Sequence, residues 1–494
     1  MKKIIMILID ALMPEALENA IKTQKTPALK FLMEHSTYIS ECVTAFPTMT
    51  ASVDSTLMTG VYPDQHKVPG LIWYHPEEKR IVNYVNGART VLKYGLIKTA
   101  KDVLVHLNES HLNKKTKTIY EELADHSKTS GAINFIIHRG KSEHHLKPPF
   151  LINLFTLFSF NNRKISGPNI LSLGAIHKPA FFGRTMVWNW NQSVFQQFGI
   201  NDDFAAEATK LVIQSGNQPD FLMVYFPDHD HFLHKHIHQP LASLEKVDQK
   251  LTKILNVFGS WDQALQQTTF IIIGDHGQTA IGKEQHHNID LDQLLKPFKV
   301  TPVGKKISET DEVVFANNER MVYVYPLKKD KREQVIKTLL SDDRIDFVAW
   351  KEKDQIHVKN HQGKELHFTK QGKKIDPYGV GWNVDGDLSL LDIKIENGAI
   401  YFNQYPDALS RLYGALFSQE IFSIVATAKP SFEFISKTFP VHLGGGSHGS
   451  LHRTDSIVPL LVSGATKNPK PNTRIVDLKD YVLDLLNVTS TTTG

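Results

Sequence analysis

Acidic and imidazole side chains recur at points where predicted strands end. The run Thr268–Ile273 is typical of a buried strand, and Asp275 and His276 follow it after a single glycine. In an open α/β sheet, ligands bind in the crevice at the carboxyl ends of the strands. A GDHG turn on its own could be an ordinary hydrogen-bonded loop. The pair therefore indicates a metal or ligand site only if other strands end in the same way.

Two other predicted strands do end in this way. The apolar run Lys3–Ile9 stops at Asp10, and Phe221–Phe226 leads into a segment in which five of the chain's 24 histidines fall within eleven residues. This segment could be a solvated polar loop. However, Asp230 and His234 are spaced i, i+4, so on a helix they would point the same way and could share one ion.

A glycine-rich segment supplies a further imidazole. The sequence GGGSHGS surrounds His448, and glycines allow the backbone to approach closely and aim a side chain into a crowded site. A flexible loop with an incidental histidine is the alternative. The combined set suits zinc, manganese or iron, and six ligands suit two ions better than one. The six candidates are Asp10, Asp230, His234, Asp275, His276 and His448.

Thr50 is the candidate nucleophile. It begins the helix predicted over Thr50–Thr59, so its hydroxyl would lie at the positive end of the helix dipole, where an anion is favoured. A metal ion at that oxygen would lower its pKa. The alternative is that Thr50, or Thr48 before it, is simply the N-cap of the helix.

Strands and helices alternate along most of the chain, as expected for a largely parallel sheet covered by helices on both faces. At 494 residues, one large domain with an insertion, or two domains, are predicted. We place the metal-binding α/β core at 1–299 and 399–494. Within it, the aromatic-rich region 148–197 is expected to form a lid or an irregular layer, and short alternating segments in 300–398 predict a smaller mixed α+β insertion.

Composition excludes several classes of protein. Apolar residues at 41% and charged residues at 22% are ordinary for a globular protein, and a net charge of +4 without clustering gives no reason to expect nucleic-acid binding. Cys42 is the only cysteine, so a disulfide within the chain and a cysteine-based metal site are excluded. The short apolar run after Lys3 fits a strand better than a signal peptide, and no run is long enough for a membrane helix. We therefore expect a cytoplasmic protein.

The order of these motifs resembles the alkaline phosphatase superfamily. The resemblance rests on Asp10 and on the segments FPTMTASVDSTLMTGVYPDQH, PDHDHFLHKH, GDHGQT and GSHGS. The resemblance is strongest to the type I phosphodiesterase and nucleotide pyrophosphatase branch, and phosphonoacetate hydrolases are also similar. It implies an α/β/α sandwich, two zinc ions with manganese as the alternative, and a covalent phospho-threonine intermediate on Thr50. One ion would be held by Asp10, Thr50, Asp275 and His276, and the other by Asp230, His234 and His448.

One residue of this chain differs from the pattern of the phosphodiesterase branch. Relatives carry an asparagine that holds a phosphoryl oxygen, and this chain has Leu71 there, which cannot donate that hydrogen bond. Trp73 and Tyr74, just beyond it, either line the substrate pocket or belong to the core. The leading hypothesis is hydrolysis of phosphodiester or pyrophosphate bonds in a small, nucleotide-like molecule. The alternatives are a phosphonate, phosphomonoester or sulfate-ester hydrolase with the same site, and a non-catalytic metal-dependent binding protein. The sequence does not predict the oligomeric state.

Overall fold

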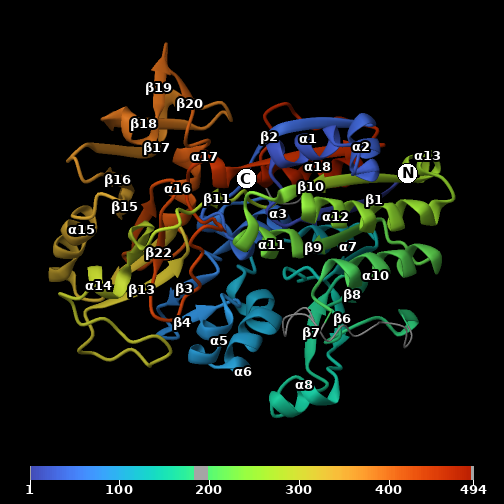
Figure 1. Cartoon of the computed structure of the whole chain (residues 1–494), viewed down its shortest axis with the longest axis horizontal. Helices are drawn as coiled ribbons and strands as arrows, with labels where there is room; N and C mark the ends of the chain where they lie inside the picture. The colour runs from blue at the N-terminus through green and yellow to red at the C-terminus, as the bar shows by residue number, and fades with distance from the viewer. Residues whose placement is uncertain (1, 183–198, 491–494) are drawn as a thin grey trace.

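A seven-stranded mixed sheet organises the larger part of the molecule (Figure 1). The computed structural model describes residues 2–182 and 199–490. Strands β1, β5, β8, β9 and β10 are paired in parallel, whereas β24 runs antiparallel to both of its neighbours. In spatial order the strands are β2 (Ser36–Val43), β24 (Ile457–Ser463), β10 (Thr268–Ile273), β1 (Lys3–Ile9), β9 (Phe221–Phe226), β5 (Ser130–Ile133) and β8 (Ile170–Ser172).

Helices cover both faces of this sheet, which gives three layers. Alternate residues of β1 point to opposite faces, so Ile5 and Ile7 lie in one apolar cluster and Met6 and Leu8 in another. The first cluster is completed by α1 (Pro14–Lys22), α2 (Pro27–Glu34), α10 (Asp202–Gln214), α12 (Pro240–Leu255) and α13 (Trp261–Gln267). The second is completed by α3 (Thr50–Thr59), the π-helix η1 (Asp102–His111), α7 (Ile119–Asp125) and α18 (Leu478–Leu485). The predicted α/β fold is thus confirmed.

A nine-stranded sheet forms the second part, at the left of Figure 1. Its strands are β13 (Val313–Asn318), β14 (Met321–Pro326), β21 (Ile424–Ala428), β15 (Ile345–Glu352), β16 (Gln355–Lys359), β17 (Glu365–Ile375), β18 (Gly381–Gly386), β20 (Ala399–Phe402) and β19 (Ile393–Glu396). Helices α15 (Arg332–Leu340) and α16 (Ala408–Leu416) pack against its core.

This sheet extends beyond the segment predicted for it. Strand β21 follows residue 398 in the chain, where the sequence indicated a return to the α/β core, yet it pairs with β14 and β15 in the middle of the second sheet. An apolar run predicts that a strand forms, but its partners are chosen by tertiary packing.

Individual elements agree closely with the sequence patterns. Strands β9 and β10 and helix α3 have the predicted bounds, and Gly60 caps α3 with a φ of 69° in the left-handed region. Strand β5 is a short strand that ends at Ile133. Among the described residues, no helix is both long and apolar enough to cross a membrane.

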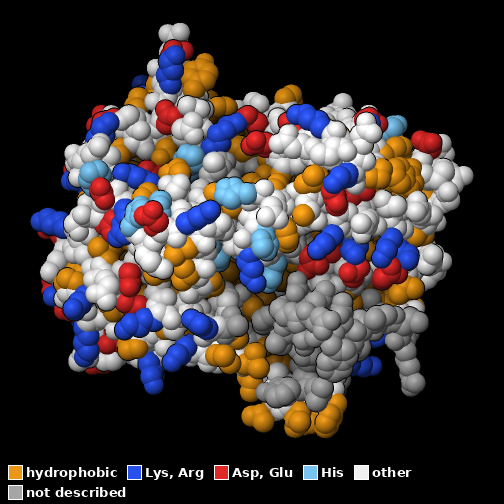
Figure 2. Space-filling model, viewed as in Figure 1, with side chains coloured by type: hydrophobic (Ala, Val, Ile, Leu, Met, Phe, Trp, Pro, Cys, Tyr) orange, Lys and Arg blue, Asp and Glu red, His pale blue; other side chains and the backbone are white. Residues whose placement is uncertain are grey.

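The aromatic-rich region is only partly described. Its residues 183–197 lie outside the described residues. In the described part, α8 (Phe150–Phe155) lies at the lower edge of the molecule in Figure 1, and Phe150, Leu154, Leu157 and Phe158 are exposed. Elsewhere on the face shown in Figure 2, acidic and basic side chains are interspersed.

Candidate metal centre and active site

The candidate ligands gather at one edge of the central sheet. Strands β10, β1 and β9 are adjacent and parallel, so their carboxyl ends lie side by side. Asp10 follows β1, and Asp275 and His276 follow β10. Strand β9 leads into α11 (Asp228–His236), which carries Asp230 and His234 one helical turn apart. The parallel register therefore brings together residues that are up to 266 positions apart in the sequence.

Asp10, Asp275 and His276 form the first ligand set. Nε2 of His276 lies 3.4 Å from Oδ1 of Asp10 and 3.4 Å from Oδ2 of Asp275. These three atoms are buried and have no hydrogen-bond partner in the described structure. The other carboxylate oxygens are occupied, because the Tyr225 hydroxyl donates to Asp10 and the backbone N–H of Ala11 donates to Asp275. Three unsatisfied polar atoms that converge in this way fit a bound cation.

Asp230 and the two remaining predicted imidazoles lie beside this set. Nε2 of His234 is 3.1 Å from Oδ2 of Asp230, and Nε2 of His448 is 3.9 Å from Oδ1 of Asp230. The His448 ring stacks on that of His276 at a centroid distance of 3.7 Å. Potential ligand atoms of Asp230, His276 and His448 lie within 4.8 Å of one another. The structure thus brings all six predicted carboxylate and imidazole ligands into one buried cluster.

Backbone carbonyls orient the three predicted imidazoles. Nδ1 of His276, His234 and His448 donates to the carbonyl oxygens of Gly277, Gly446 and Thr48 respectively. A ring whose Nδ1–H is engaged in this way presents its Nε2 lone pair, which is the arrangement found in metal-ligating histidines. Each ring therefore offers Nε2 to the centre of the cluster.

Burial and crowding perturb the titration of these groups. Burial raises the pKa of Asp10 well above its usual range, and the charges of Asp275 and Asp230 raise it further. Burial also opposes the charge on Asp230, but the nearby His234 imidazole holds the pKa of that carboxyl well below its usual range. Although burial disfavours a charged His234, the Asp230 and Glu319 carboxylates raise its pKa to about 10. Protons and divalent cations therefore compete for the same atoms.

The glycines near His448 are required by close contacts. A Cβ added to Gly445 would lie 1.9 Å from the carbonyl oxygen of His234, and one added to Gly446 would lie 2.0 Å from Oε1 of Gln278. The Gly-rich loop can pass over α11 only because these positions carry no side chain. This contact explains the GGGSHG pattern physically.

Thr50 begins the helix that faces this loop. The hydroxyl of Thr48 donates to the carbonyl of Ser450, so Thr48 is committed to the Gly-rich loop, and Met49 is the N-cap residue of α3. No side chain caps the N-terminus of this helix. Thr50 is partly exposed, whereas the other residues of 42–59 are buried. The N-cap alternative for these two threonines is thereby removed, and Thr50 as a residue is partly exposed.

Trp73 and Tyr74 lie on β3 (Ile72–His75) and are 4% and 6% exposed. Trp73 packs in the core beside the central sheet, and Tyr74 packs in that of the second sheet. The structure thus favours the core interpretation over substrate contact for both. Leu71 also packs against the core, while its backbone N–H donates to Oδ1 of Asn318.

The structure adds two residues that the sequence motifs did not reveal. Glu319 lies in the tight turn between β13 and β14 with a φ of 62°, and His442 precedes the glycines of the GGGSHG loop. Potential ligand atoms of Glu319, His442 and His234 lie within 4.8 Å of one another. Burial disfavours a charged Glu319, but His448, His442 and His234 lower its pKa to about 2. Of these two residues, only His442 has a signal in the sequence, because it lies six residues before His448 and close to the glycines.

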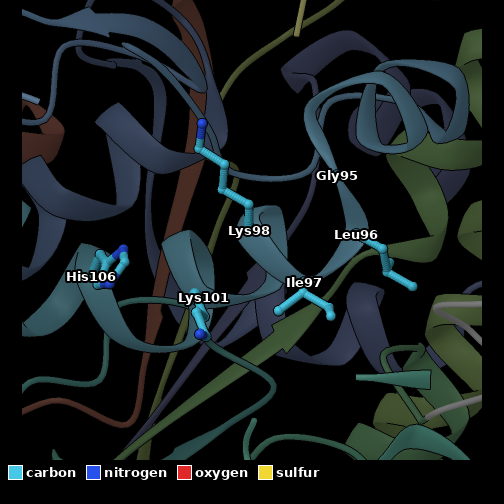
Figure 3. A pocket seen from close by; sticks show the side chains of 6 residues that line it. All are labelled: Gly95, Leu96, Ile97, Lys98, Lys101 and His106. Carbon is cyan, nitrogen blue, oxygen red and sulfur yellow. The ribbon is translucent and has the colours of Figure 1, made fainter. Parts of the chain in front are cut away.

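A separate pocket lies away from these residues. It is lined by Gly95, Leu96, Ile97, Lys98, Lys101 and His106 (Figure 3). These residues come from α6 (Leu96–Lys101), the glycine before it and η1. None of the candidate ligands contributes to it, so the candidate site is a polar buried cluster and not this pocket.

Sequence comparison agrees with this geometry. The family model of type I phosphodiesterases and nucleotide pyrophosphatases matches residues 4–450. The chain belongs to this family. As a type I phosphodiesterase/nucleotide pyrophosphatase family member, it is a hydrolase that acts on phosphoester bonds. No curated protein sequence matches the chain.

Solved structures of other family members share the fold of this phosphodiesterase family protein. Human ectonucleotide pyrophosphatase/phosphodiesterase 5 superposes with a TM-score of 0.58 at 15% identity, and the murine protein with 0.57 at 14%. Each match covers 100% of this chain and 97% of the other. An inactive variant of the murine protein, in complex with AMP, also matches, with a TM-score of 0.57 at 13% identity. At such low identity the likeness shows the fold alone.

Proposed function

We propose that this family member hydrolyses phosphodiester or pyrophosphate bonds of a small, nucleotide-like molecule with two divalent metal ions and Thr50 as nucleophile. The proposed ions are zinc, with manganese as the alternative. Asp10, Asp275 and His276 would hold the first ion together with the Thr50 hydroxyl, and Asp230, His234 and His448 would hold the second.

One observation carries this proposal. Oδ1 of Asp10, Oδ2 of Asp275 and Nε2 of His276 converge in the interior without hydrogen-bond partners in the described structure. Leaving such groups unpaired is costly, and a divalent cation satisfies all three at once. Carboxylate and imidazole ligands in this number suit a pair of ions that stabilise an in-line displacement at phosphorus.

The residues of the chain position Thr50 for attack. The Thr44 hydroxyl donates to the carbonyl of Asp275, and Thr48 accepts the Nδ1–H of His448, so the segment before α3 is tied to both ligand loops. Divalent ions bound there would lower the pKa of the Thr50 hydroxyl and stabilise charge on the phosphoryl oxygens. The uncapped N-terminus of α3 favours an anion at the same place.

In the proposed reaction, Oγ of Thr50 loses its proton and bonds to phosphorus as the bond to the leaving oxygen breaks. The leaving group departs with the electron pair of that bond and gains a proton, which balances the proton lost by Thr50; in the second step one proton of the attacking water returns to the Thr50 oxygen. Water then attacks the phosphorus of the covalent phospho-threonine intermediate, and the Thr50 hydroxyl is restored. Two successive displacements divide one difficult hydrolysis into two easier steps.

Turnover of bis(p-nitrophenyl) phosphate by Thr50→Ala tests this mechanism. We expect loss of turnover with the bound metal retained, whereas the matched variant Thr50→Ser keeps a hydroxyl and forms the covalent adduct. The adduct can be trapped by acid quench and detected by intact-protein mass spectrometry. Undiminished turnover by Thr50→Ala would exclude Thr50 as the nucleophile.

A second candidate keeps the site and changes the substrate to a phosphonate, a phosphomonoester or a sulfate ester. Leu71 motivates it, because the amide that holds a phosphoryl oxygen in relatives is missing here and the Leu71 side chain packs against the core. A panel of these esters ranked by kcat/KM decides between the candidates. If no ester is turned over and metal still binds, the non-catalytic binding protein is favoured.

Small phosphate esters are the partners that this proposal requires. We also propose a cytoplasmic location, which is supported by Cys42 being the only cysteine of the chain. Localisation of the tagged protein in cells of its source tests the proposed cytoplasmic location.

A further inference from the structure

A second group of imidazole and carboxylate side chains lies where the hairpin of β3 and β4 (Arg80–Asn83) packs against η1. It consists of His75 at the end of β3, Glu78 in the turn before β4, and His111 at the end of η1. One potential ligand atom from each lies within 4.8 Å of the other two. None of the predicted metal ligands belongs to this group, which we call the hairpin cluster.

His111 carries a buried ring nitrogen that is left unpaired. Its Nε2 has no hydrogen-bond partner among the described residues, and its side chain is 0% exposed. The other ring nitrogen, Nδ1, lies 2.7 Å from the hydroxyl oxygen of Tyr84. Burial lowers the pKa of His111 to about 4, so the ring is neutral near pH 7. With its proton on Nδ1, donated to Tyr84, the ring presents the Nε2 lone pair as metal-ligating histidines do, and a cation there would satisfy it.

The carboxylate of Glu78 lies close to both imidazoles. Its Oε1 is 3.5 Å from Nε2 of His111 and 3.7 Å from Nε2 of His75. Both separations exceed the ordinary length of an N–H···O hydrogen bond. Two ligand atoms that share a tetrahedral zinc ion, each about 2.0 to 2.1 Å from it, are roughly 3.3 Å apart. A similar spacing of 3.4 Å separates Nε2 of His276 from the carboxylate oxygens of the first ligand set.

Arg80 holds Glu78 in this orientation. Its Nε donates to Oε2 of Glu78, while Nη1 and Nη2 donate to the two carboxylate oxygens of Asp102 at 2.6 and 2.7 Å. Nδ1 of His106, which is labelled at the neighbouring pocket in Figure 3, also donates to Asp102, at 2.9 Å. Because both oxygens of Asp102 are engaged, this residue supports Arg80 and is not assigned as a ligand. Glu78 keeps Oε1 directed toward the imidazoles.

His75 makes one hydrogen bond that ion binding would change. The backbone N–H of Glu78 donates to Nδ1 of His75 at 3.3 Å, which is long for such a bond. An ion at Nε2 would move the ring proton to Nδ1, so this contact would be lost and the N–H would turn to solvent. The side chains of His75 and Glu78 are 18% and 36% exposed, so an ion and a water molecule can reach the hairpin cluster.

We propose that His75, Glu78 and His111 bind a divalent cation, preferably zinc, at a site separate from the two-ion centre. Two imidazoles and one carboxylate form a known zinc ligand set, in which water takes the fourth position. The ion would join the hairpin of β3 and β4 to the end of η1. This inference concerns metal binding and does not depend on the proposed hydrolysis.

Zinc stoichiometry of the full chain tests the proposal. Chelator-treated protein is loaded with zinc, desalted and analysed by mass spectrometry of the metal. Glu78→Gln and His111→Asn should each bind one ion fewer than the wild type. The matched control Glu77→Gln removes an exposed charge next to Glu78 and should keep the wild-type count. Tyr84→Phe should weaken the affinity for this one ion by about 10-fold to 100-fold, because it removes the hydroxyl that orients His111.

Cobalt(II) gives a local readout that a damaged fold would not reproduce. The ring of Trp73 lies 5.0 Å from that of His75 and 5.3 Å from that of His111, measured between centroids. Cobalt bound by the hairpin cluster should therefore quench the fluorescence of Trp73. The part of the quenching that Trp73→Phe abolishes should be absent from Glu78→Gln and retained in Glu77→Gln. Circular dichroism verifies that each variant is folded.

Two results would overturn the proposal. One is an equal zinc count in the wild type and in Glu78→Gln. The other is the loss of an ion from Glu77→Gln as well, which would make the effect one of surface charge. Because Glu78 lies at the surface, Glu78→Gln carries the test even if His111→Asn does not fold. Turnover of phosphate esters enters none of these measurements, so the failure of this inference and the failure of the proposed function are distinguishable.

Discussion

Arg320 joins the second sheet to the loops of the candidate site through a fully buried ion pair. Its guanidinium Nη1 lies 2.6 and 2.7 Å from the two carboxylate oxygens of Asp455. The same nitrogen donates to the hydroxyls of Thr279, in the strand after the GDHG turn, and Ser450, which follows GSHG. Both Arg320 and Asp455 are 0% exposed. Removing the cation should therefore destabilise the fold and both loops.

The expected cost follows from the partners that remain. In Arg320→Met the aliphatic stem is preserved, and Asp455 keeps the backbone N–H and hydroxyl of Ser450 and the hydroxyl of Thr279. Its charge is left buried without a cation, which costs about 3 to 5 kcal/mol in comparable pairs. These donors, together with the Thr454 hydroxyl at 3.4 Å, place the expected cost near the lower end, at about 3 kcal/mol.

A double-mutant cycle isolates the ion pair from the lost packing. Arg320→Met, Asp455→Asn and the double variant are unfolded in urea, followed by tryptophan fluorescence and far-UV circular dichroism. Trp73 and Trp382 report on the cores of the central and second sheets respectively. Because Asp455→Asn removes the uncompensated charge, the double variant should cost about 1 to 3 kcal/mol less than the sum of the single variants. Additive effects, or a cost below about 1 kcal/mol for Arg320→Met, would refute the reasoning.

Three further predictions concern ionisation, metal binding and helix capping. Burial, and then the charge of Asp275, raise the pKa of Asp54 well above its usual value, so in metal-free protein the folded state holds a proton that the unfolded state releases above about pH 4. The free energy of unfolding should therefore fall as the pH rises. Measured by urea unfolding, Asp54→Asn should be more stable than the wild type at pH 7 but not near pH 4. A gain in stability that does not depend on pH would contradict this. Removal of metal by a chelator should lower the thermal unfolding midpoint, because an ion present at 100 times its Kd contributes about 2.7 kcal/mol to stability. Added zinc or manganese should restore the midpoint. An unchanged midpoint would contradict metal binding. Thr118→Ala should cost about 1 kcal/mol in urea unfolding because the Thr118 hydroxyl accepts from the backbone N–H of Glu121 at the start of α7, whereas Thr118→Ser should be nearly neutral.

The elements that carry the predicted ligands could be identified from the sequence because their signals are local. Strands β1, β9 and β10 are continuous apolar runs, which is the pattern of strands buried on both faces. The i, i+4 spacing of Asp230 and His234 already specified one face of a helical turn. Parallel strands then required the ends of these elements to meet at one edge of the sheet.

Other features were decided only by tertiary structure. Glu319 is brought to His448 because the turn between β13 and β14 packs against the Gly-rich loop, where the N–H of Arg320 donates to the carbonyl of His448. No local pattern marks a lone glutamate in a hairpin turn as a ligand. Strand β21 was visible as an apolar run, but its place in the second sheet depends on pairing with β14 and β15. Local composition determines that a segment forms a strand and what its end carries, whereas contacts between distant segments determine which side chains share a site.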